Sequence, residues 1–123
     1  MTSSFRVLGV AGATFAGLDT FPAPAGVTEV RLVTDEVTAL CPVTGQPDWY
    51  TVEITYQPRG RCVESKSLKL YLQTYRNRGI FCEAFAAQVA QDLAEALGTV
   101  VTVSVTQKPR GGISIRSTAT AGS

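Results

Sequence analysis

The chemistry that this sequence suggests begins in the stretch CPVTGQPDWY, where Cys41 precedes Asp48 by seven positions. A cysteine acts as a nucleophile in its thiolate form, and an aspartate can pass a proton to the group that the thiolate attacks. The prolines and the glycine between them indicate either an ordinary turn between strands or a rigid loop that holds nucleophile and acid at a fixed separation. These residues alone do not distinguish the two interpretations, because most cysteines are small buried hydrophobic side chains with no catalytic role.

Two further stretches carry groups that could bind an anion. In VESKSLKLYL, Lys66 and Lys69 lie three positions apart and share one face of a predicted helix. Glu64 comes directly before this helix, and Ser65 is predicted to cap it. In PRGGISI, Arg110 precedes two glycines whose backbone N–H groups can approach a phosphate. A capped, solvated helix and a plain glycine turn would produce the same patterns.

The elements that must position these residues follow from hydrophobic periodicity. Alternating apolar residues predict strands, and apolar residues at helical spacing predict two helices between them. The strands are expected over 28–34, 51–58, 99–107 and 112–117, and the helices over 66–77 and 81–98. The order ββααββ favours an α+β fold with two helices packed on one face of an antiparallel sheet. The sheet edges would be open in a lone subunit, so we expect edge-to-edge association.

Particular residues sharpen these expectations. Val52, Ile54 and Tyr56 are predicted to face inward from their strand, as are Leu68, Leu72 and Tyr75 from the first helix. The second helix should bury an apolar series that recurs every four residues and should end at Gly98. The series consists of Phe81, Phe85, Val89, Leu93 and Leu97. Residues 18–26 are expected to be a connection, 109–112 a hairpin turn, and the tail 116–123 is expected to fray.

Length and composition limit the classes of protein. The chain has 123 residues with 45% hydrophobic and 17% charged residues, which is typical of one globular domain, residues 1–123. The odd number of cysteines, Cys41, Cys62 and Cys82, argues against a secreted disulfide scaffold. Because there is no histidine and no paired cysteine motif, we expect no zinc site and no other metal.

The ends and the charge distribution add two expectations. The first residues, MTSSFRVLGVAGATFAG, contain one basic residue and an apolar stretch broken by glycines, which is not typical of a signal peptide. With no long apolar run either, we expect a cytoplasmic protein that does not cross a membrane. Residues 1–58 carry two basic and six acidic residues, whereas residues 59–123 carry nine basic and four acidic ones. The basic half is suited to a phosphorylated cofactor or a nucleic acid, although a solvated face explains it equally well.

The stretches CPVTGQPDW, VESKSLKLYL, YRNRGIFCE and PRGGISI, in this order and spacing, closely resemble the short, single-module form of the QueF family. The resemblance covers roughly residues 18–117. Members of this family are NADPH-dependent nitrile reductases of the queuosine pathway, which modifies tRNA. They convert 7-cyano-7-deazaguanine to 7-aminomethyl-7-deazaguanine. The family's fold is the tunnelling fold, whose subunits join their sheets into rings with active sites at the subunit interfaces.

The resemblance implies a role for each matching residue. Cys41 matches the nucleophile that forms a covalent thioimide with the nitrile, and Asp48 matches the general acid. The positions that match substrate-binding residues are Val63, Glu64, Ser65, Cys82 and Glu83. The positions that match NADPH-binding residues are Ser65, Lys66, Arg110 and Gly111. The resemblance further implies a homo-oligomer of two stacked pentamers, acting on a small molecule without direct contact to nucleic acid.

The sequence departs from the family pattern at one position. Cys82 occupies the place of a histidine that is thought to contact substrate, while the adjacent Glu83 is kept. A thiol is smaller and a weaker hydrogen-bond donor, so the reaction is expected to be slow, to use water in the histidine's place, or to act on an altered substrate. Another hypothesis is a disulfide between Cys82 and Cys41 that blocks the nucleophile.

Two rival functions stay open at this point. Archaeosine-type amidinotransferases resemble the family, keep the cysteine and the aspartate, and add ammonia to the nitrile on tRNA without reducing it. They lack the NADPH-associated motif that is complete here as ESKSLKLY, which favours the reductase. The other rival is a non-catalytic ring-forming protein that binds a deazapurine, and the lost histidine is consistent with it.

Overall fold

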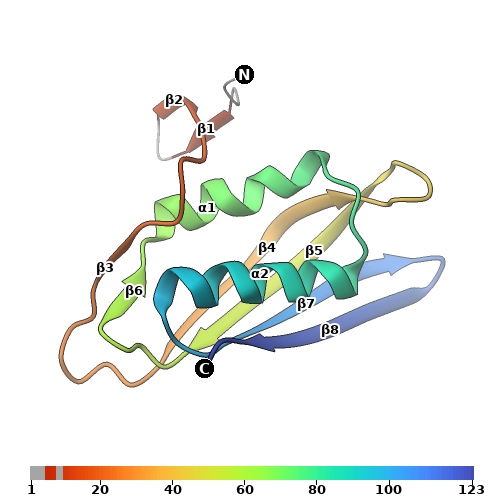
Figure 1. Cartoon of the computed structure of the whole chain (residues 1–123). Helices are drawn as coiled ribbons and strands as arrows, with labels where there is room; N and C mark the ends of the chain where they lie inside the picture. The colour runs from red at the N-terminus through yellow and green to blue at the C-terminus, as the bar shows by residue number, and fades with distance from the viewer. Residues whose placement is uncertain (1–4, 8–9) are drawn as a thin grey trace.

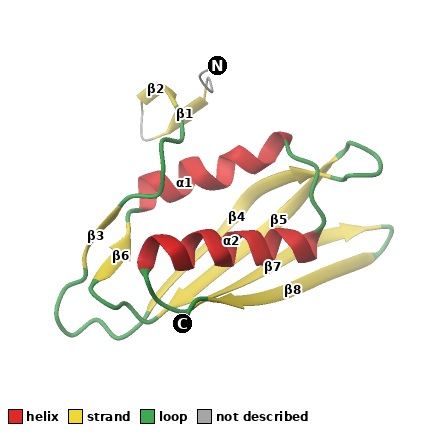
Figure 2. Cartoon of the chain, viewed as in Figure 1, coloured by secondary structure: helices red, strands yellow, loops and turns green. Residues whose placement is uncertain are grey.

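The fold is a four-stranded antiparallel sheet with two helices packed on one face, as seen in a computed structural model that describes residues 5–7 and 10–123 (Figure 1, Figure 2). The sheet has the strand order β4-β5-β7-β8. The strands of the sheet are β4 (Val30–Leu40), β5 (Pro47–Tyr56), β7 (Val101–Arg110) and β8 (Ile113–Ala121). The two helices, α1 (Ser65–Gln73) and α2 (Cys82–Leu97), lie between β5 and β7 in the chain. The predicted order ββααββ of an α+β fold is therefore confirmed.

Short elements surround this unit. β3 (Thr20–Pro22) pairs antiparallel with β6 (Arg61–Val63), and β1 (Phe5–Val7) pairs with β2 (Val10–Ala13). A single 3-10 turn, η1 (Thr74–Asn77), continues α1. The segment 18–26, which was predicted to be a connection, also contains the three-residue strand β3, which the sequence analysis did not predict. Strands of three residues are too short to show the alternation on which the prediction relied.

The core lies between the helices and the inner face of the sheet. The predicted inward residues of β5 and α1 are all buried: Val52, Ile54, Tyr56, Leu68, Leu72 and Tyr75. In α2, the predicted apolar series is buried from Phe85 onward, and Gly98 ends the helix with a φ of 65° and an N–H that donates to the carbonyl of Ala94. Phe81 departs from the prediction, since it precedes the helix as its N-cap residue and is 55% exposed.

Glu64, and not Ser65, caps α1. Its two carboxylate oxygens accept the backbone N–H groups of Lys66 and Ser67, each at 2.8 Å. Ser65 is already the first helical residue, so its hydroxyl is one position too late to act as the cap. The predicted Ser65 cap was therefore wrong, and Glu64 has a structural role at the start of the helix.

The tail does not fray as expected. β8 continues to Ala121, which is paired with Val101 at the start of β7. Small and polar residues are compatible with a strand when a neighbouring strand supplies the hydrogen bonds, and their composition does not reveal that partner. β4 is also longer than predicted, and its pairing with β5 shifts register between Thr34 and Val37.

The elements divide the molecule into two ends (Figure 1). The β4–β5 turn, the β7–β8 turn and the beginning of α2 lie at one end. The beginning of α1, together with β3 and β6, lies at the other end. This division decides which of the predicted site residues one chain brings together.

Candidate active site

Cys41 begins the tight turn that joins β4 to β5. Its N–H donates to the carbonyl of Gln46 at 2.8 Å, and its own carbonyl accepts the N–H of Gly45 at 2.8 Å. Gly45 has a φ of 72°, a conformation that glycine adopts at no steric cost. Both interpretations of this stretch, a turn and a rigid loop, therefore describe the segment: it is a hydrogen-bonded turn with a partly exposed cysteine.

The turn favours the thiolate of Cys41. The hydroxyl of Thr44 and the backbone N–H groups of Thr44 and Val43 stabilise the anion and lower the pKa of Cys41 from 9.0 to about 7, with a smaller contribution from the charge of Arg110. Near neutral pH about half of such thiols are ionised. Cys41 therefore has the electrostatic setting that a nucleophile requires.

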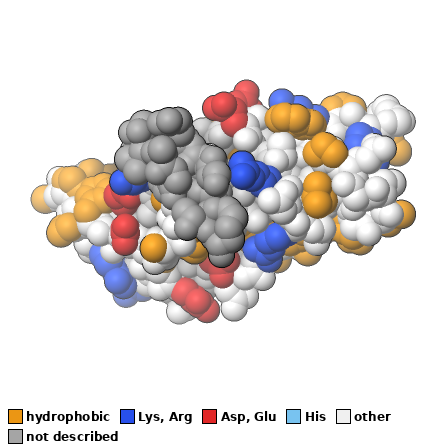
Figure 3. Space-filling model, turned by 90° about the horizontal axis from the view of Figure 1, so that it is seen from above, with side chains coloured by type: hydrophobic (Ala, Val, Ile, Leu, Met, Phe, Trp, Pro, Cys, Tyr) orange, Lys and Arg blue, Asp and Glu red, His pale blue; other side chains and the backbone are white. Residues whose placement is uncertain are grey.

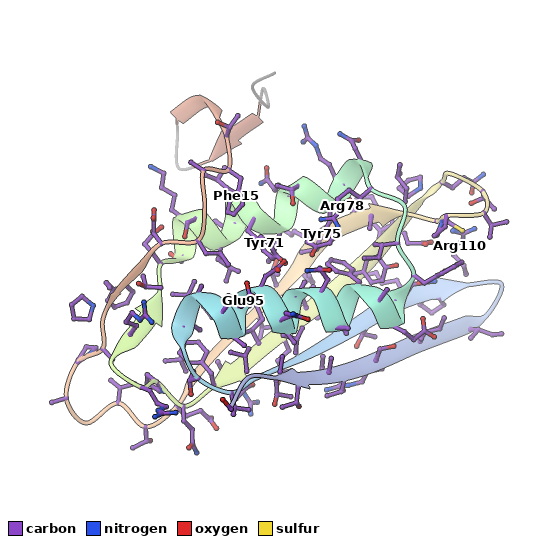
Figure 4. All side chains as sticks on the ribbon, in the orientation of Figure 1. Phe15, Tyr71, Tyr75, Arg78, Glu95 and Arg110 are labelled. Carbon is purple, nitrogen blue, oxygen red and sulfur yellow. The ribbon has the colours of Figure 1, made fainter. Side chains whose placement is uncertain are left out.

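Asp48 lies beside this turn, near the beginning of β5. It is only 5% exposed, and its Oδ1 accepts a hydrogen bond of 2.5 Å from Nη1 of Arg110, at the end of β7. Arg110 is 39% exposed, and the hydrogen bond to Asp48 raises its pKa. A buried carboxylate needs such a cationic partner to offset its loss of hydration. Figure 4 shows Arg110 beside the β4–β5 turn.

Residues 78–80 place the beginning of α2 next to the Cys41 turn. The N–H of Leu40 donates to the carbonyl of Arg78 at 2.8 Å, and the N–H of Ile80 donates to the carbonyl of Leu40 at 3.0 Å. A Cβ on Gly79 would lie 3.5 Å from the Cα of Pro42, so the two segments run in close contact. α2 begins two residues after Ile80, which brings Cys82 and Glu83 to this end of the molecule.

Tyr50, which the sequence analysis did not single out, lies at the centre of this group. Burial raises its pKa well above the usual range, and the negative charges that nearby residues carry when ionised raise it further. Those residues are Asp48, Cys82, Cys41 and Glu83. The Tyr50 hydroxyl donates to Oε1 of Gln107 at 3.2 Å. Tyr50 comes two positions after Asp48 on β5, so strand alternation places both on one face and could have identified it.

Cys82 and Glu83 differ in their surroundings. Cys82 is 1% exposed, and its Sγ donates a hydrogen bond of 3.4 Å to the carbonyl of Val105. Both Cys41 and Cys82 are free thiols. Glu83 is exposed in the first turn of α2, where the helix dipole favours its negative charge. Glu83 is therefore open to a ligand, whereas the Cys82 thiol is used within the core.

The remaining predicted residues lie at the other end of the molecule, where α1 begins (Figure 1). They are Val63, Glu64, Ser65 and Lys66. Val63 is buried and its N–H donates to the Tyr56 hydroxyl at 3.0 Å, while Glu64 caps α1. α1 and η1, which together rise roughly 20 Å, separate this group from residues 78–80 beside Cys41. One chain therefore assembles Cys41, Asp48, Cys82, Glu83, Arg110 and Gly111, and holds the other four residues apart.

The groups available to a phosphorylated cofactor are spread in the same way. On the face in Figure 3, the Lys and Arg side chains lie in separate places and form no continuous patch. Gly111 has a φ of 60° and open space beside it, so its backbone is accessible to a ligand.

Among residues 5–7 and 10–123, no cluster of three possible metal-binding side chains occurs. No helix in the described part is long and apolar enough to span a membrane.

Comparison with known proteins identifies the family. The profile of the family described as QueF-like protein matches residues 47–123. The chain belongs to the QueF-like family. This QueF-like chain is 48% identical over 104 residues to the NADPH-dependent 7-cyano-7-deazaguanine reductase of Frankia casuarinae. The alignment covers 84% of the chain and 83% of the relative. The reductase of the same name from Streptococcus mutans is 51% identical over 81 residues, which is 65% of the chain and 50% of the relative.

A solved structure supports the fold of this QueF-like chain. The crystal structure of the archaeosine synthase QueF-Like in the apo form matches with a TM-score of 0.72 and 27% sequence identity. The match covers 78% of this chain and 95% of the other. The tunnelling fold expected from the resemblance is thus confirmed for the single subunit.

Proposed function

We propose that this QueF-like protein is an NADPH-dependent reductase of 7-cyano-7-deazaguanine, with 7-aminomethyl-7-deazaguanine as the product, in the biosynthesis of queuosine. The relatives of that name support the substrate and the cofactor. The single observation in the structure that carries the proposal is the Cys41 turn. There a thiol with a pKa of about 7 lies near a buried aspartate that is paired with arginine.

The covalent step explains why both residues are needed. A nitrile carbon is a poor hydride acceptor, and addition of the Cys41 sulfur converts it to an imine-like carbon that can be reduced. The S–C bond forms as one C–N π bond breaks, and the nitrogen gains a proton to give a neutral thioimide. Asp48, which is a carboxylate in its ion pair with Arg110, takes this proton from the Cys41 thiol and delivers it to the nitrogen, where charge develops as the carbon is attacked.

The cofactor supplies the two hydrides that turn the nitrile into an amine, so two NADPH are consumed for each substrate. The residues of this chain bind and orient the reactants. Glu83, exposed beside the Cys41 turn, is suited to accept hydrogen bonds from the N–H edge of the deazaguanine. Lys66, Ser65, Arg110 and Gly111 are proposed to hold NADPH, whose phosphate charges match the two cations.

Assembly would bring the two halves of this site together. Apart from the bridge between Leu40 and Gly79 at the end of β4, the outer edges of β4 and β8 have no partner strand within the described sheet, so β4 of one subunit can pair with β8 of the next. In such a ring, the α1 start of one subunit can complete the Cys41 site of another. We therefore propose a homo-oligomer of two stacked pentamers, with Val63, Glu64, Ser65 and Lys66 contributed across the interface.

We also infer that residues 1–123 form one domain in the cytoplasm. The buried residues of the described helices and of the four-stranded sheet form one hydrophobic cluster. All three cysteines are free, as expected for a reducing compartment.

We propose that Cys82 also makes the enzyme sensitive to oxidation. A disulfide with Cys41 would remove the nucleophile, and it would first require Cys82 to leave its hydrogen bond with Val105. The Cys82→Ala variant should then lose less activity than the wild type after exposure to a mild oxidant, and a thiol reductant should restore the wild type alone. Equal losses in the two proteins would exclude the harmful link.

The structural match to an archaeosine synthase favours one second candidate, an amidinotransferase that acts on the nitrile without reduction. Incubation with 7-cyano-7-deazaguanine and NADPH separates the candidates. Oxidation of NADPH with formation of the amine supports the reductase, and the Cys41→Ala variant is the control. A covalent adduct without NADPH oxidation would instead indicate a transferase or an inactive binder, and no adduct would refute the covalent mechanism.

A further inference from the structure

We propose that Arg110 is a positioning residue for the attack on the nitrile, holding Asp48 and the Cys41 turn in place, separately from any contact that it makes with NADPH. The inference rests on the proposed function for its substrate. It assigns to Arg110 a task before any hydride transfer, whereas the resemblance to the QueF family implies only a cofactor contact.

The guanidinium of Arg110 uses both of its outer nitrogens on the catalytic turn. Nη1 donates to Oδ1 of Asp48 at 2.5 Å, and Nη2 donates to Oγ1 of Thr44 at 3.5 Å. The planar fork of an arginine fixes two acceptors relative to each other, which a lysine cannot do. Arg110 therefore connects the end of β7 to two residues that follow Cys41, Thr44 in the turn and Asp48 near the beginning of β5.

The contact with Thr44 extends to the nucleophile. Oγ1 of Thr44 accepts from the N–H of Gln46 at 3.2 Å and from Arg110. A hydroxyl has two acceptor lone pairs and one hydrogen, so both lone pairs are used and the hydrogen is left to donate to the Cys41 sulfur. That donation is the largest cause of the lowered Cys41 pKa. Arg110 thus orients the hydroxyl that stabilises the thiolate.

The contact with Asp48 fixes the proton donor. Because Arg110 binds Oδ1, the other carboxylate oxygen is the one left to accept the proton of the Cys41 thiol and to pass it to the nitrile nitrogen. In the addition step, the Cys41 thiol loses its proton to Asp48, the sulfur forms a bond to carbon, one C–N π bond breaks, and the nitrogen receives that proton from Asp48. No electrons are exchanged with a cofactor in this step, so it takes place without NADPH.

This independence from NADPH gives a direct test. The rate of adduct formation between the protein and 7-cyano-7-deazaguanine is measured by intact mass in the absence of NADPH, for the wild type, Arg110→Gln and Arg110→Lys. We expect Arg110→Gln to slow adduct formation by about 10- to 100-fold, the range for a misplaced catalytic group. Arg110→Lys should recover only part of that loss, because it keeps the charge and lacks the fork.

Lys108→Gln is the matched control, since Lys108 is an exposed cation on β7, an inner strand of the sheet, and should leave the rate unchanged. The inference is overturned if Arg110→Gln forms the adduct at the wild-type rate and only raises the KM for NADPH. Thermal unfolding of each variant separates a loss of fold from a loss of positioning.

A second measurement needs no substrate. Alkylation of Cys41 by iodoacetamide is followed against pH by peptide mass, and the midpoint of the profile should shift upward in Arg110→Gln and in Thr44→Val. Unchanged midpoints in both variants would refute the link from Arg110 to the thiolate. If the wild type forms no adduct with the nitrile, the proposed function fails, and the alkylation profiles still decide whether Arg110 positions the turn.

Discussion

The two ends of this molecule prepare their predicted site residues in different ways. At the end with the β4–β5 turn, Cys41, Asp48 and Arg110 are brought into one set of interactions by a single chain. At the end where α1 begins, Val63 is part of the core and the Glu64 carboxylate is engaged in capping the helix. The first end thus holds a reactive group in place, whereas at the second end two of the four side chains, Val63 and Glu64, are engaged in the fold of their own subunit.

The comparison teaches that the reactive residues and two of the proposed cofactor residues, Ser65 and Lys66, lie at different ends of one subunit. In the proposed assembly, a ligand that reaches both would bridge two subunits, because α1 and η1 lie between the two ends of each one. The predictions below test whether the first end alone performs the covalent step and whether the second end is mainly structural within its own chain.

The largest effect is expected from Cys41→Ala, which should abolish both adduct formation and turnover, because no other described thiol is exposed at that end. Intact mass and NADPH oxidation measure the two losses. Replacement of a partly exposed side chain in a turn should leave the thermal unfolding temperature nearly unchanged. Turnover that persists in Cys41→Ala would show that the β4–β5 turn does not supply the nucleophile.

The pH dependence of Cys41 alkylation should show whether the β4–β5 turn stabilises the thiolate. Because the thiolate is the reactive form and the pKa of Cys41 is about 7, the alkylation rate should fall about tenfold for each pH unit below 7 and level off above pH 8. Peptide-resolved alkylation by iodoacetamide at several pH values measures it. A midpoint near 9, the ordinary value for a thiol, would show that the turn does not stabilise the thiolate.

A smaller effect is expected at the second end. Glu64→Ala should destabilise the fold by about 1 kcal/mol, because it removes the acceptor for two N–H groups at the start of α1. Ser65→Ala is the matched control and should change the free energy of unfolding by only a few tenths of that. Denaturant unfolding measures both. Similar losses in the two variants would contradict the assignment of the cap to Glu64.

The stabilisation that the Glu64 cap contributes should depend on pH. The backbone N–H groups of Ser67 and Lys66 hold the pKa of Glu64 below its usual range. A lowered folded-state pKa means that this stabilisation is present above the pKa of the unfolded chain and is lost as the pH falls through the folded-state value. The stability difference between the wild type and Glu64→Ala should therefore shrink in acid.

The fold was largely predictable from the sequence because its long elements repeat a pattern. Alternation marked β5 and four-residue spacing marked α2, whereas β3 and β6 are too short to repeat anything. The end of β8 escaped prediction because Ala121 is held by its pairing with Val101, a contact between residues distant in sequence.

The candidate site was predictable as a list of residues and not as a set of interactions. Cys41 and Asp48 were marked by their turn and by the family resemblance. The hydrogen bond from Arg110 to Asp48 joins positions 62 apart and exists because β7 pairs with β5. Side-chain direction and pairing register decide such contacts, and local sequence carries little information on either.

The central claim is that the active site takes the Cys41 turn from one subunit and the beginning of α1 from another. Coexpression of Cys41→Ala with Lys66→Ala, each inactive alone, tests it most directly. Random assembly should restore about a quarter of wild-type NADPH oxidation, since that share of sites pairs an intact Cys41 with an intact Lys66. Activity that stays at the background of the single variants would show that both residues must come from the same chain, and would contradict the account.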